Sequence, residues 1–255
     1  MIEQLFGLGG RTALITGSSK GIGFALAGGL AAAGARVVLN ARSEAPLAAA
    51  KQQLQDQGFD CHAVAFDVTD AAAVQTHIDT IEAEIGPLDI LINNAGMQFR
   101  TVLQDFPVDK WSELMRTNLD SAFYVGQACA KYMIQRGAGK IINICSVQSE
   151  LGRPGIAPYA ASKGALKMLT KGMSIDWAPH GLQVNGLGPG YFKTELNQAL
   201  VDDPEFSAWL SKRTPAGRWG DVNELIGAGV FLSSSASSFV NGHILYVDGG
   251  ITSSL

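Results

Sequence analysis

The sequence predicts an α/β fold, a doubly wound, Rossmann-like parallel sheet of about seven strands with helices on both faces. Short aliphatic runs recur along the 255 residues, and the gaps between them leave room for a helix. The runs are almost continuously apolar, which is typical of strands buried on both faces. A glycine cluster follows the first run directly and opens the first long helix.

Each expected strand is a run of β-branched or aliphatic residues between turn signals. The seven runs are residues 13–16, 37–39, 64–66, 90–92, 141–144, 184–187 and 244–247. Apolar residues at helical spacing predict helices over residues 21–33, 44–57, 71–85, 111–135, 159–177 and 222–232. Because no repeat, low-complexity tract or linker divides the chain, we expect a single domain over residues 1–255.

The longest interruption of this alternation runs from Gly190 to Gly220. It carries Pro204 and Pro215, and its apolar spacing predicts one amphipathic helix around residues 196–210. A long excursion after the carboxyl end of a strand is where such folds place a substrate lid. We therefore expect a lid at residues 190–220, with an ordinary surface insertion as the alternative.

Charge and cysteine content argue against several classes of protein. The net charge of −4 provides no basic field for nucleic acid or anionic lipid. Three widely spaced cysteines fit reduced intracellular thiols better than a disulfide framework, and the four histidines lack the spacing of metal ligands. The first residues lack the pattern of a signal peptide, and Arg36 interrupts the Ala/Gly-rich stretch from Phe24 before it is long enough to span a membrane. We expect a soluble, cytoplasmic protein without a metal site.

Residues 16–23, Thr-Gly-Ser-Ser-Lys-Gly-Ile-Gly, predict a dinucleotide site. Glycine lets the backbone approach a pyrophosphate, whose charge is met by free amides and by the positive end of the helix. The alternative is a plain tight turn, although the strand before it and the helix after it favour the binding motif. The expected cofactor contacts are Gly17, Ser19, Lys20, Gly21, Ile22 and Gly23.

The end of the second strand favours NADP(H). A site for NAD usually places a carboxylate there to bind the ribose 2′-hydroxyl, whereas this strand ends in Asn40-Ala41-Arg42. Lys20 and Arg42 are two cations that could converge on a 2′-phosphate. We therefore predict NADP(H), with NAD(H) used at lower efficiency. The alternative is that both cations are solvated surface charges.

Tyr159 and Lys163 predict general acid–base chemistry. Four residues apart, they lie on one face of a helix, so the ammonium can act on the phenol. A free phenol has a pKa near about 10, and a neighbouring cation is needed to favour the phenolate near neutral pH. Ser146 ends the fifth strand, where its hydroxyl can hold the reacting oxygen of a substrate. Tyr159 would then exchange a proton with an alcohol or ketone while hydride passes to or from nicotinamide.

Together these motifs resemble the short-chain dehydrogenase/reductase family, and the resemblance covers essentially the whole chain. It is carried by the glycine spacing, by Asn93-Asn94-Ala95-Gly96, and by Tyr159 and Lys163 with Ser146 before them. The resemblance implies that Asn118 is a fourth catalytic residue, which anchors a water linking Lys163 to solvent. Further cofactor contacts implied by it are Asp67, Val68, Asn94, Ala95, Gly96, Tyr159, Lys163, Pro189, Gly190, Phe192 and Thr194.

The family resemblance also implies a homotetramer. The helices expected over residues 111–135 and 159–177 would pack across one interface, and residues 247–251 resemble the segment at another.

Residues 143–153, 190–195 and 212–220 resemble the members of this family that interconvert D-gluconate and 5-dehydro-D-gluconate. A small polyhydroxy acid requires a cation for its carboxylate and polar side chains for its hydroxyls. The candidate substrate contacts are Gln98, Arg100, Ser146, Gln148, Arg153 and Tyr159. Two positions depart from that pattern. Phe99-Arg100 stands where two basic residues are usual, and Gly188, which would loosen the following loop, stands where alanine or serine is usual.

Three alternatives stay open at this stage. A 3-oxoacyl-carrier-protein reductase shares the catalytic residues and NADPH but should present a basic patch to its acidic carrier. The candidate cations for such a patch are Arg100, Lys110, Lys131 and Arg136. The substrate could also be another sugar, a polyol or a steroid. A binding scaffold or sensor without catalysis would typically lack the tyrosine or the lysine, both of which are present here.

Overall fold

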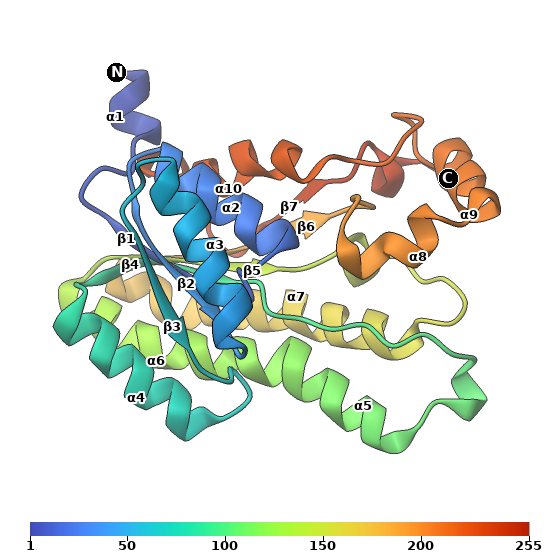
Figure 1. Ribbon diagram of the computed structural model, residues 1–255, viewed down its shortest axis with the longest axis horizontal. Coiled ribbons are helices and arrows are strands. Elements are labelled where there is room, and N and C mark those ends of the chain that lie inside the picture. Colours follow the sequence, from blue (N-terminus) through green and yellow to red (C-terminus); the bar gives the residue numbers. More distant parts are fainter. Residues whose placement is uncertain (255) are drawn as a thin grey trace.

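The computed structural model, which describes residues 1–254, contains a parallel seven-stranded sheet in the order β3-β2-β1-β4-β5-β6-β7 (Figure 1). The strands are β1 (Thr12–Ile15), β2 (Arg36–Ala41), β3 (Cys61–Ala65), β4 (Leu88–Asn93), β5 (Gly139–Ile144), β6 (Leu182–Pro189) and β7 (Ile244–Val247). All six neighbouring pairs are parallel. The predicted fold class is confirmed.

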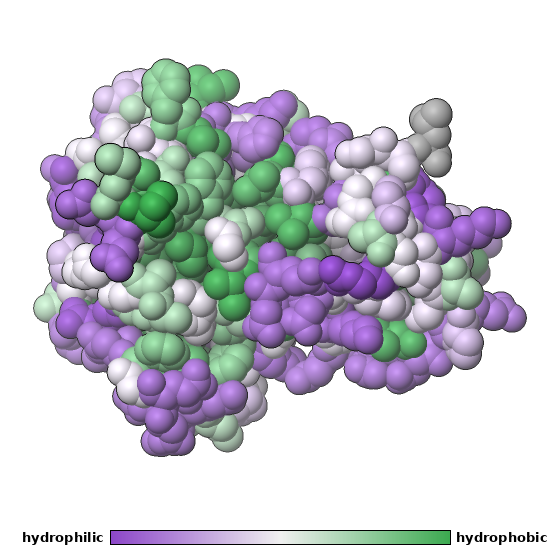
Figure 2. Space-filling view, turned by 90° about the horizontal axis from the view of Figure 1, so that it is seen from above, coloured by the Kyte–Doolittle hydropathy of each residue, from purple (hydrophilic) through white to green (hydrophobic). Residues whose placement is uncertain are grey.

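Helices cover both faces of the sheet (Figure 1). One face carries α2 (Gly21–Ala32), α3 (Glu44–Asp56) and α10 (Ile226–Ser233), and the other carries α4 (Ala71–Glu84), α6 (Ser121–Arg136) and α7 (Ala157–Trp177). The remaining helices are α1 (Ile2–Phe6), α5 (Val108–Met115), α8 (Gln198–Val201) and α9 (Pro204–Arg213). Figure 2 looks onto the side that carries α2 and α10 and shows a broad hydrophobic area there, beside a mostly hydrophilic end that carries α8 and α9.

Alternate residues of β1 pack into two different cores. Ile15 joins Leu26 and Leu30 of α2, whereas Leu14 joins Ile78 and other residues of α4, and all of these side chains are fully buried. Full burial of a leucine or isoleucine stabilises a fold by roughly 1.5–3 kcal/mol. The sheet is therefore held from both sides, as the continuous apolar runs predict.

The strand order reverses between β1 and β4, which places a crevice at their carboxyl ends. The Thr16 hydroxyl accepts hydrogen bonds of 3.0 Å from the main-chain amides of Asn94 and Ala95. The Asn94 side chain in turn donates 2.9 Å bonds to the carbonyl oxygens of Thr16 and Gly17. These bonds fix the loops after β1 and β4 to each other at the crevice.

The helix predicted over residues 111–135 is present, since α5, residues 116–120 and α6 follow one another without a break, but it is not a regular α-helix. Residues 116–120 form a π-helical turn between α5 and α6. Such a turn adds a residue to the helix and redirects a side chain, and it is frequent at functional sites. Here the turn contains the buried Asn118.

The single helix predicted around residues 196–210 is wrong, because two helices lie there and α8 ends at Val201. Asp203 caps α9, since its carboxylate accepts hydrogen bonds from the amides of Glu205 and Phe206 at 3.0 and 3.1 Å. Pro204 takes the first position of α9, where its missing amide hydrogen costs nothing. We call residues 190–220 the lid segment. It lies at the end of the molecule toward which β6 runs (Figure 1).

Within residues 1–254, none of the helices is long and apolar enough to cross a membrane.

Candidate active site

A cavity of about 940 Å³ opens at the carboxyl edge of the sheet. It is bordered by the glycine turn after β1, by the loops after β2, β4 and β5, by α7 and by the lid segment. Its volume is near the upper end of ligand sites, which span roughly 300–1,000 Å³. Of the predicted site residues, all but Gly23 and Asn118 line this cavity.

The glycine turn has the shape of a pyrophosphate cradle. Gly17 and Gly21 have φ values of +61° and +60°, a region that residues with a Cβ rarely adopt. A Cβ on Gly17 would lie 2.8 Å from the Ala95 Cα, so the two loops meet there backbone to backbone. A Cβ on Gly21 would meet no described atom within 4 Å, so the space beside its Cα is open at the N-terminus of α2. The turn thus fits a phosphate group of a dinucleotide.

Two cations flank the end of β2. The Asn40 side chain is buried and donates to the carbonyl oxygens of Val64 and Phe66 at 3.2 and 3.1 Å, so it has a structural role. Arg42 is exposed at the rim of the cavity, and Lys20 forms an ion pair with Glu195 of the lid segment. These charges fit a 2′-phosphate, but Lys20 is engaged by a carboxylate that the sequence did not predict.

Asp67 lines the cavity at the carboxyl side of β3. One of its carboxylate oxygens accepts hydrogen bonds of 2.8 Å from both the amide and the hydroxyl of Thr69. The local turn thus orients a side chain that the family resemblance assigns to the cofactor.

Ser146, which the sequence predicts to be catalytic, is oriented by its own loop. Its Oγ accepts a 3.1 Å hydrogen bond from the amide of Gln148, which leaves the hydroxyl hydrogen free to point elsewhere. The Ser149 hydroxyl accepts from the amide of Ser146 at 3.3 Å and donates to the carbonyl oxygen of Lys163 at 2.8 Å. Ser149 therefore joins the serine loop to α7. Sequence reasoning missed it, although a serine three residues after another is a capping-box signal.

Tyr159 and Lys163 project from α7 into the cavity. The Lys163 Nζ lies 5.7 Å from the centre of the Tyr159 ring and donates a 2.7 Å hydrogen bond to the carbonyl oxygen of Ile144. Burial lowers the pKa of Lys163 to about 8. Burial raises the pKa of Tyr159 to about 12, while the Ser146 hydroxyl and the Arg100 charge act against this rise. Without a further cation in the cavity, Tyr159 is a phenol at neutral pH.

Asn118 lies behind the cavity wall. Its Oδ1 accepts from the amide of Met97 at 2.7 Å, and its Nδ2 donates to the Met97 carbonyl oxygen and to the Ser162 hydroxyl at 3.0 and 3.2 Å. A Cβ added to Gly96 would lie 3.4 Å from the Asn118 Oδ1 and 4.0 Å from the Lys163 Nζ, so the three residues adjoin. The side chain of Asn118 thus links the loop after β4 to α7.

Three predicted substrate residues carry buried polar atoms without a partner among residues 1–254. They are the Oε1 atoms of Gln98 and Gln148 and the Nε of Arg153. An unsatisfied buried polar group costs roughly 1–3 kcal/mol, which a bound hydroxylated ligand would offset. Gln148 is held in place by Tyr191, whose hydroxyl accepts a 3.2 Å bond from its Nε2.

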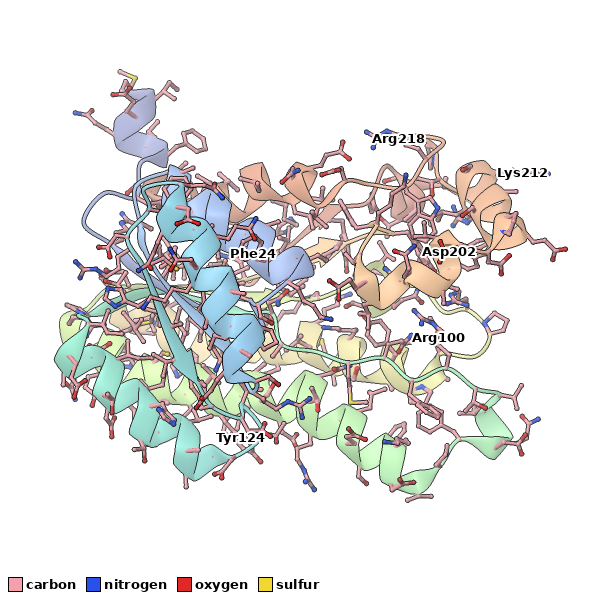
Figure 3. The ribbon with its side chains drawn as sticks, viewed as in Figure 1. Phe24, Arg100, Tyr124, Asp202, Lys212 and Arg218 are labelled. Carbon is pink, nitrogen blue, oxygen red and sulfur yellow. The ribbon has the colours of Figure 1, made fainter. Side chains whose placement is uncertain are left out.

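Arg100 and Arg153 are neighbours. Burial, followed by the positive charge of Arg153, lowers the pKa of Arg100. Figure 3 shows Arg100 below α8, on the side of the lid segment that faces the rest of the chain. The lid residues Tyr191, Asn197 and Phe206, which contact the predicted substrate residues, were missed because no local pattern marks them.

Gly188, the departure noted in the sequence, has a packing role in the structure. It lies within β6, where a Cβ would approach a ring carbon of Tyr246 to 2.5 Å. The glycine is required by this close contact between β6 and β7.

Comparisons with known proteins agree with this geometry. A family model described as short chain dehydrogenase matches residues 11–205. The chain is 60% identical over 252 residues to a gluconate 5-dehydrogenase of Gluconobacter oxydans, covering 99% of this chain and 98% of that protein. It is 52% identical over 250 residues to a 5-keto-D-gluconate 5-reductase of Escherichia coli K12, covering 98% of each.

Among solved structures, a gluconate 5-dehydrogenase from Burkholderia cenocepacia in complex with NADP and tartrate is 60% identical, with a TM-score of 0.98 and full coverage of both chains. The predicted resemblance is confirmed, and the chain belongs to the short-chain dehydrogenase family of oxidoreductases.

Proposed function

We propose that this chain is an NADP(H)-dependent oxidoreductase that interconverts D-gluconate and 5-dehydro-D-gluconate. The observation that carries the proposal is a single cavity wall on which Tyr159 and Ser146 lie near two neighbouring cations, Arg100 and Arg153. A hydroxylated acid matches these cations and the unpaired amide oxygens beside them. The names of the relatives in Gluconobacter oxydans and Escherichia coli support the same substrate.

The cofactor proposal is NADP(H), with NAD(H) used at lower efficiency. It is supported by Lys20 and Arg42 at the cavity rim and by the neutral Asn40 where an NAD site usually has a carboxylate. The Burkholderia cenocepacia relative, which was solved with NADP, supports it as well. When bound, the nicotinamide would accept or supply the hydride.

The residues of this chain handle the proton. In oxidation, the Tyr159 oxygen takes the hydroxyl proton from C5 of D-gluconate, and in reduction it returns that proton to the ketone oxygen. The Ser146 hydroxyl holds the same substrate oxygen, because its own oxygen is already engaged by the amide of Gln148. Lys163 favours the phenolate through its charge. Since the side chain of Asn118 is engaged by Met97 and Ser162, the water assigned to it would lie against its main-chain carbonyl.

The structure offers little support for a 3-oxoacyl-carrier-protein reductase. Of the four candidate cations, Arg136 bonds to Glu82 and to the carbonyl oxygen of Leu88, at the amino end of β4. Arg100 follows the carboxyl end of the same strand, so these two cations lie at opposite edges of the sheet. Lys110 is paired with Glu113. A dispersed set of cations, two of which are paired with carboxylates, is a poor match for an acidic carrier protein.

A scaffold or sensor role is disfavoured by the complete set of Asn118, Ser146, Tyr159 and Lys163 around one cavity. Retained catalytic groups with shifted pKa values favour an enzyme.

We further propose a homotetramer in the cytoplasm, built from one domain. Apolar side chains are exposed along the helices that the family resemblance assigns to an interface: Trp111, Phe123, Met168 and Ile175. The three cysteines are free and buried, which fits a reducing compartment. Light scattering that shows a monomer would contradict the tetramer.

The deciding experiment follows NADP⁺ reduction by D-gluconate at alkaline pH and NADPH oxidation by 5-keto-D-gluconate near neutral pH. Acetoacetyl-CoA serves as the control ketone. We expect turnover with the gluconate pair and none with the thioester, and turnover of the thioester alone would replace the substrate assignment. Tyr159→Phe should lower turnover by roughly 10²–10⁴-fold, the usual contribution of a general acid–base group. A Tyr159→Phe variant as active as wild type would overturn the mechanism.

A further inference from the structure

Arg100 and Arg153 come from the body of the molecule, yet both are contacted by the lid segment. Arg100, labelled in Figure 3, lies in the loop after β4. Its Nη2 donates a 3.2 Å hydrogen bond to the Oδ1 of Asn197. Arg153 lies between β5 and α7, and its guanidinium carbon is 5.1 Å from the centre of the Phe206 ring. Within residues 1–254, the side chain of Arg153 has one hydrogen bond, which is local, at 3.4 Å to the carbonyl oxygen of Pro154.

These lid contacts hold the guanidinium groups without neutralising them. Asn197 offers a neutral amide oxygen and Phe206 offers an aromatic face. The Nε of Arg153 is buried and has no partner within residues 1–254. The two positively charged guanidinium groups therefore adjoin the cavity and keep N–H donors for a ligand. A carboxylate would accept hydrogen bonds from these donors and balance the positive charge.

We propose that Asn197 and Phe206 are positioning residues that make the enzyme selective for acids, because they hold Arg100 and Arg153 in a two-cation site for the substrate carboxylate. The inference rests on the proposed function, since it takes the substrate to be a hydroxylated acid.

Each positioning residue is itself fixed to the rest of the lid segment. The Nδ2 of Asn197 donates a 3.2 Å hydrogen bond to the carbonyl oxygen of Phe192, just after β6. Phe206 packs in an aromatic cluster, with ring centres 5.2 Å from Trp209, 5.7 Å from Tyr191 and 6.0 Å from Trp219. The place of each arginine therefore depends on the place of the lid. A neutral substrate has no carboxylate for these arginines to bind, so its binding should not depend on how the lid segment holds them.

The test compares 5-keto-D-gluconate with L-sorbose, its neutral counterpart in which a hydroxymethyl group replaces the carboxylate. Asn197→Asp keeps an oxygen against Arg100 but adds a charge that competes with the substrate, so the KM for 5-keto-D-gluconate should rise roughly tenfold, the scale of a charged hydrogen bond. Phe206→Leu removes the aromatic face and should raise that KM roughly threefold. In both variants kcat for the acid should change less than KM, and kcat/KM for L-sorbose should stay at its wild-type value.

Two variants serve as matched controls. Phe206→Tyr keeps the aromatic face and should behave as wild type. Gln198→Ala alters an exposed residue of α8 next to Asn197 and should also leave the KM for 5-keto-D-gluconate unchanged. If Asn197→Asp and Phe206→Leu lower kcat/KM for both ketones by the same factor, these residues are merely structural and the inference is wrong, while the proposed function stands.

Calorimetric titration of tartrate into the NADP⁺-loaded protein separates the two proposals. If wild type does not reduce 5-keto-D-gluconate, the proposed function fails. If wild type nevertheless binds tartrate, and Asn197→Asp and Phe206→Leu weaken this binding, the acid site stands. If tartrate binds wild type and both variants equally, or binds none of them, the inference is overturned.

Discussion

The Lys163 ammonium donates a 2.7 Å hydrogen bond to the main-chain carbonyl oxygen of Ile144, the last residue of β5. This bond anchors the buried end of Lys163 to the sheet, while the Tyr159 ring centre lies 5.7 Å away. Two features therefore fix the position of Lys163 relative to Tyr159. The two residues are one turn apart on α7, and the lysine is bonded to the end of β5. In the proposed mechanism, the lysine acts on the phenol through its charge rather than by a direct bond.

The buried pair predicts opposite pH dependences for the two directions. Burial raises the pKa of Tyr159 to about 12, so the proton donor for reduction is present at neutral pH, whereas oxidation needs the phenolate. With saturating cofactor, kcat/KM for D-gluconate should rise between about pH 6 and about pH 10. In contrast, kcat/KM for 5-keto-D-gluconate should be level over that range and fall only as the pH approaches about 12, because NADPH brings no positive nicotinamide to lower the pKa of Tyr159. Oxidised nicotinamide adds a positive charge, which favours the phenolate. The pH at which kcat/KM for D-gluconate reaches half of its maximum should therefore lie below about 12, the pKa of Tyr159 without cofactor.

Replacing Lys163 with Met should shift the rise in D-gluconate oxidation to higher pH, because the cation that favours the phenolate is lost. Lys163→Arg, which keeps the charge, should shift it less. An oxidation rate that does not change with pH would contradict the role given to Tyr159.

Cofactor selectivity should depend on two cations from different loops. Lys20→Ala and Arg42→Ala should each raise the KM for NADP⁺ by roughly 10-fold or more, since each removes a charge-assisted contact to the 2′-phosphate. The KM for NAD⁺, which lacks that phosphate, should change little. Steady-state kinetics with both cofactors checks this expectation.

Glu195→Gln is the matched control for Lys20. It removes the ion pair with Lys20 but keeps the cation, so the KM for NADP⁺ should not rise. Wild-type enzyme that used NAD⁺ and NADP⁺ with equal efficiency would exclude the phosphate clamp.

The strands, the glycine turn and the pairing of Tyr159 with Lys163 on one helix could be predicted because each has a local signature. The apolar runs and the glycine turn occupy a few consecutive residues, and Tyr159 and Lys163 are one helical turn apart. Most cofactor and substrate candidates line one cavity because the carboxyl ends of parallel strands share an edge.

Contacts between distant segments carry no such signature. Lys20 and Glu195 are 175 positions apart, and the bond from Arg100 to Asn197 joins two loops separated by 97. The π-helical turn around Asn118 interrupts a pattern that is helical on both sides, so periodicity alone predicts one helix. These features depend on packing that forms only when the whole chain folds.

Ser149 provides a test of how the serine loop is positioned. Its hydroxyl links the amide of Ser146 to the carbonyl oxygen of Lys163, so Ser149→Ala should let the loop and α7 shift relative to each other. We expect kcat to fall roughly 5–10-fold, the equivalent of about 1–1.5 kcal/mol for a hydrogen bond, with a smaller change in KM. Ser149→Thr keeps the hydroxyl and should restore most of the activity. Equal activity of Ser149→Ala and wild type would show that the link is dispensable.

Lys140 is a buried cation that the proposed mechanism does not use. It lies near the amino end of β5, is 7% exposed and donates a 3.1 Å hydrogen bond to the Ser237 hydroxyl. Burial, followed by the charge of Arg11, lowers its pKa to about 8. Unfolded lysine has a pKa of about 10.4, so the unfolded chain binds more protons between these two values. This group therefore destabilises the fold fully below about pH 8, and the penalty disappears toward about pH 10.5.

Lys140→Met should accordingly increase the free energy of unfolding at neutral pH by roughly 1–3 kcal/mol, given that one pKa unit corresponds to about 1.4 kcal/mol. Urea unfolding at pH 7 and at about pH 10.5 checks this, since the gain should shrink at the higher pH. Lys140→Arg keeps the charge and should show no gain, and kcat should stay at its wild-type value because Lys140 lies at the edge of the sheet opposite Ser146. If Lys140→Met is instead less stable by the same amount at both pH values, the hydrogen bond to Ser237 outweighs the cost of burying the charge.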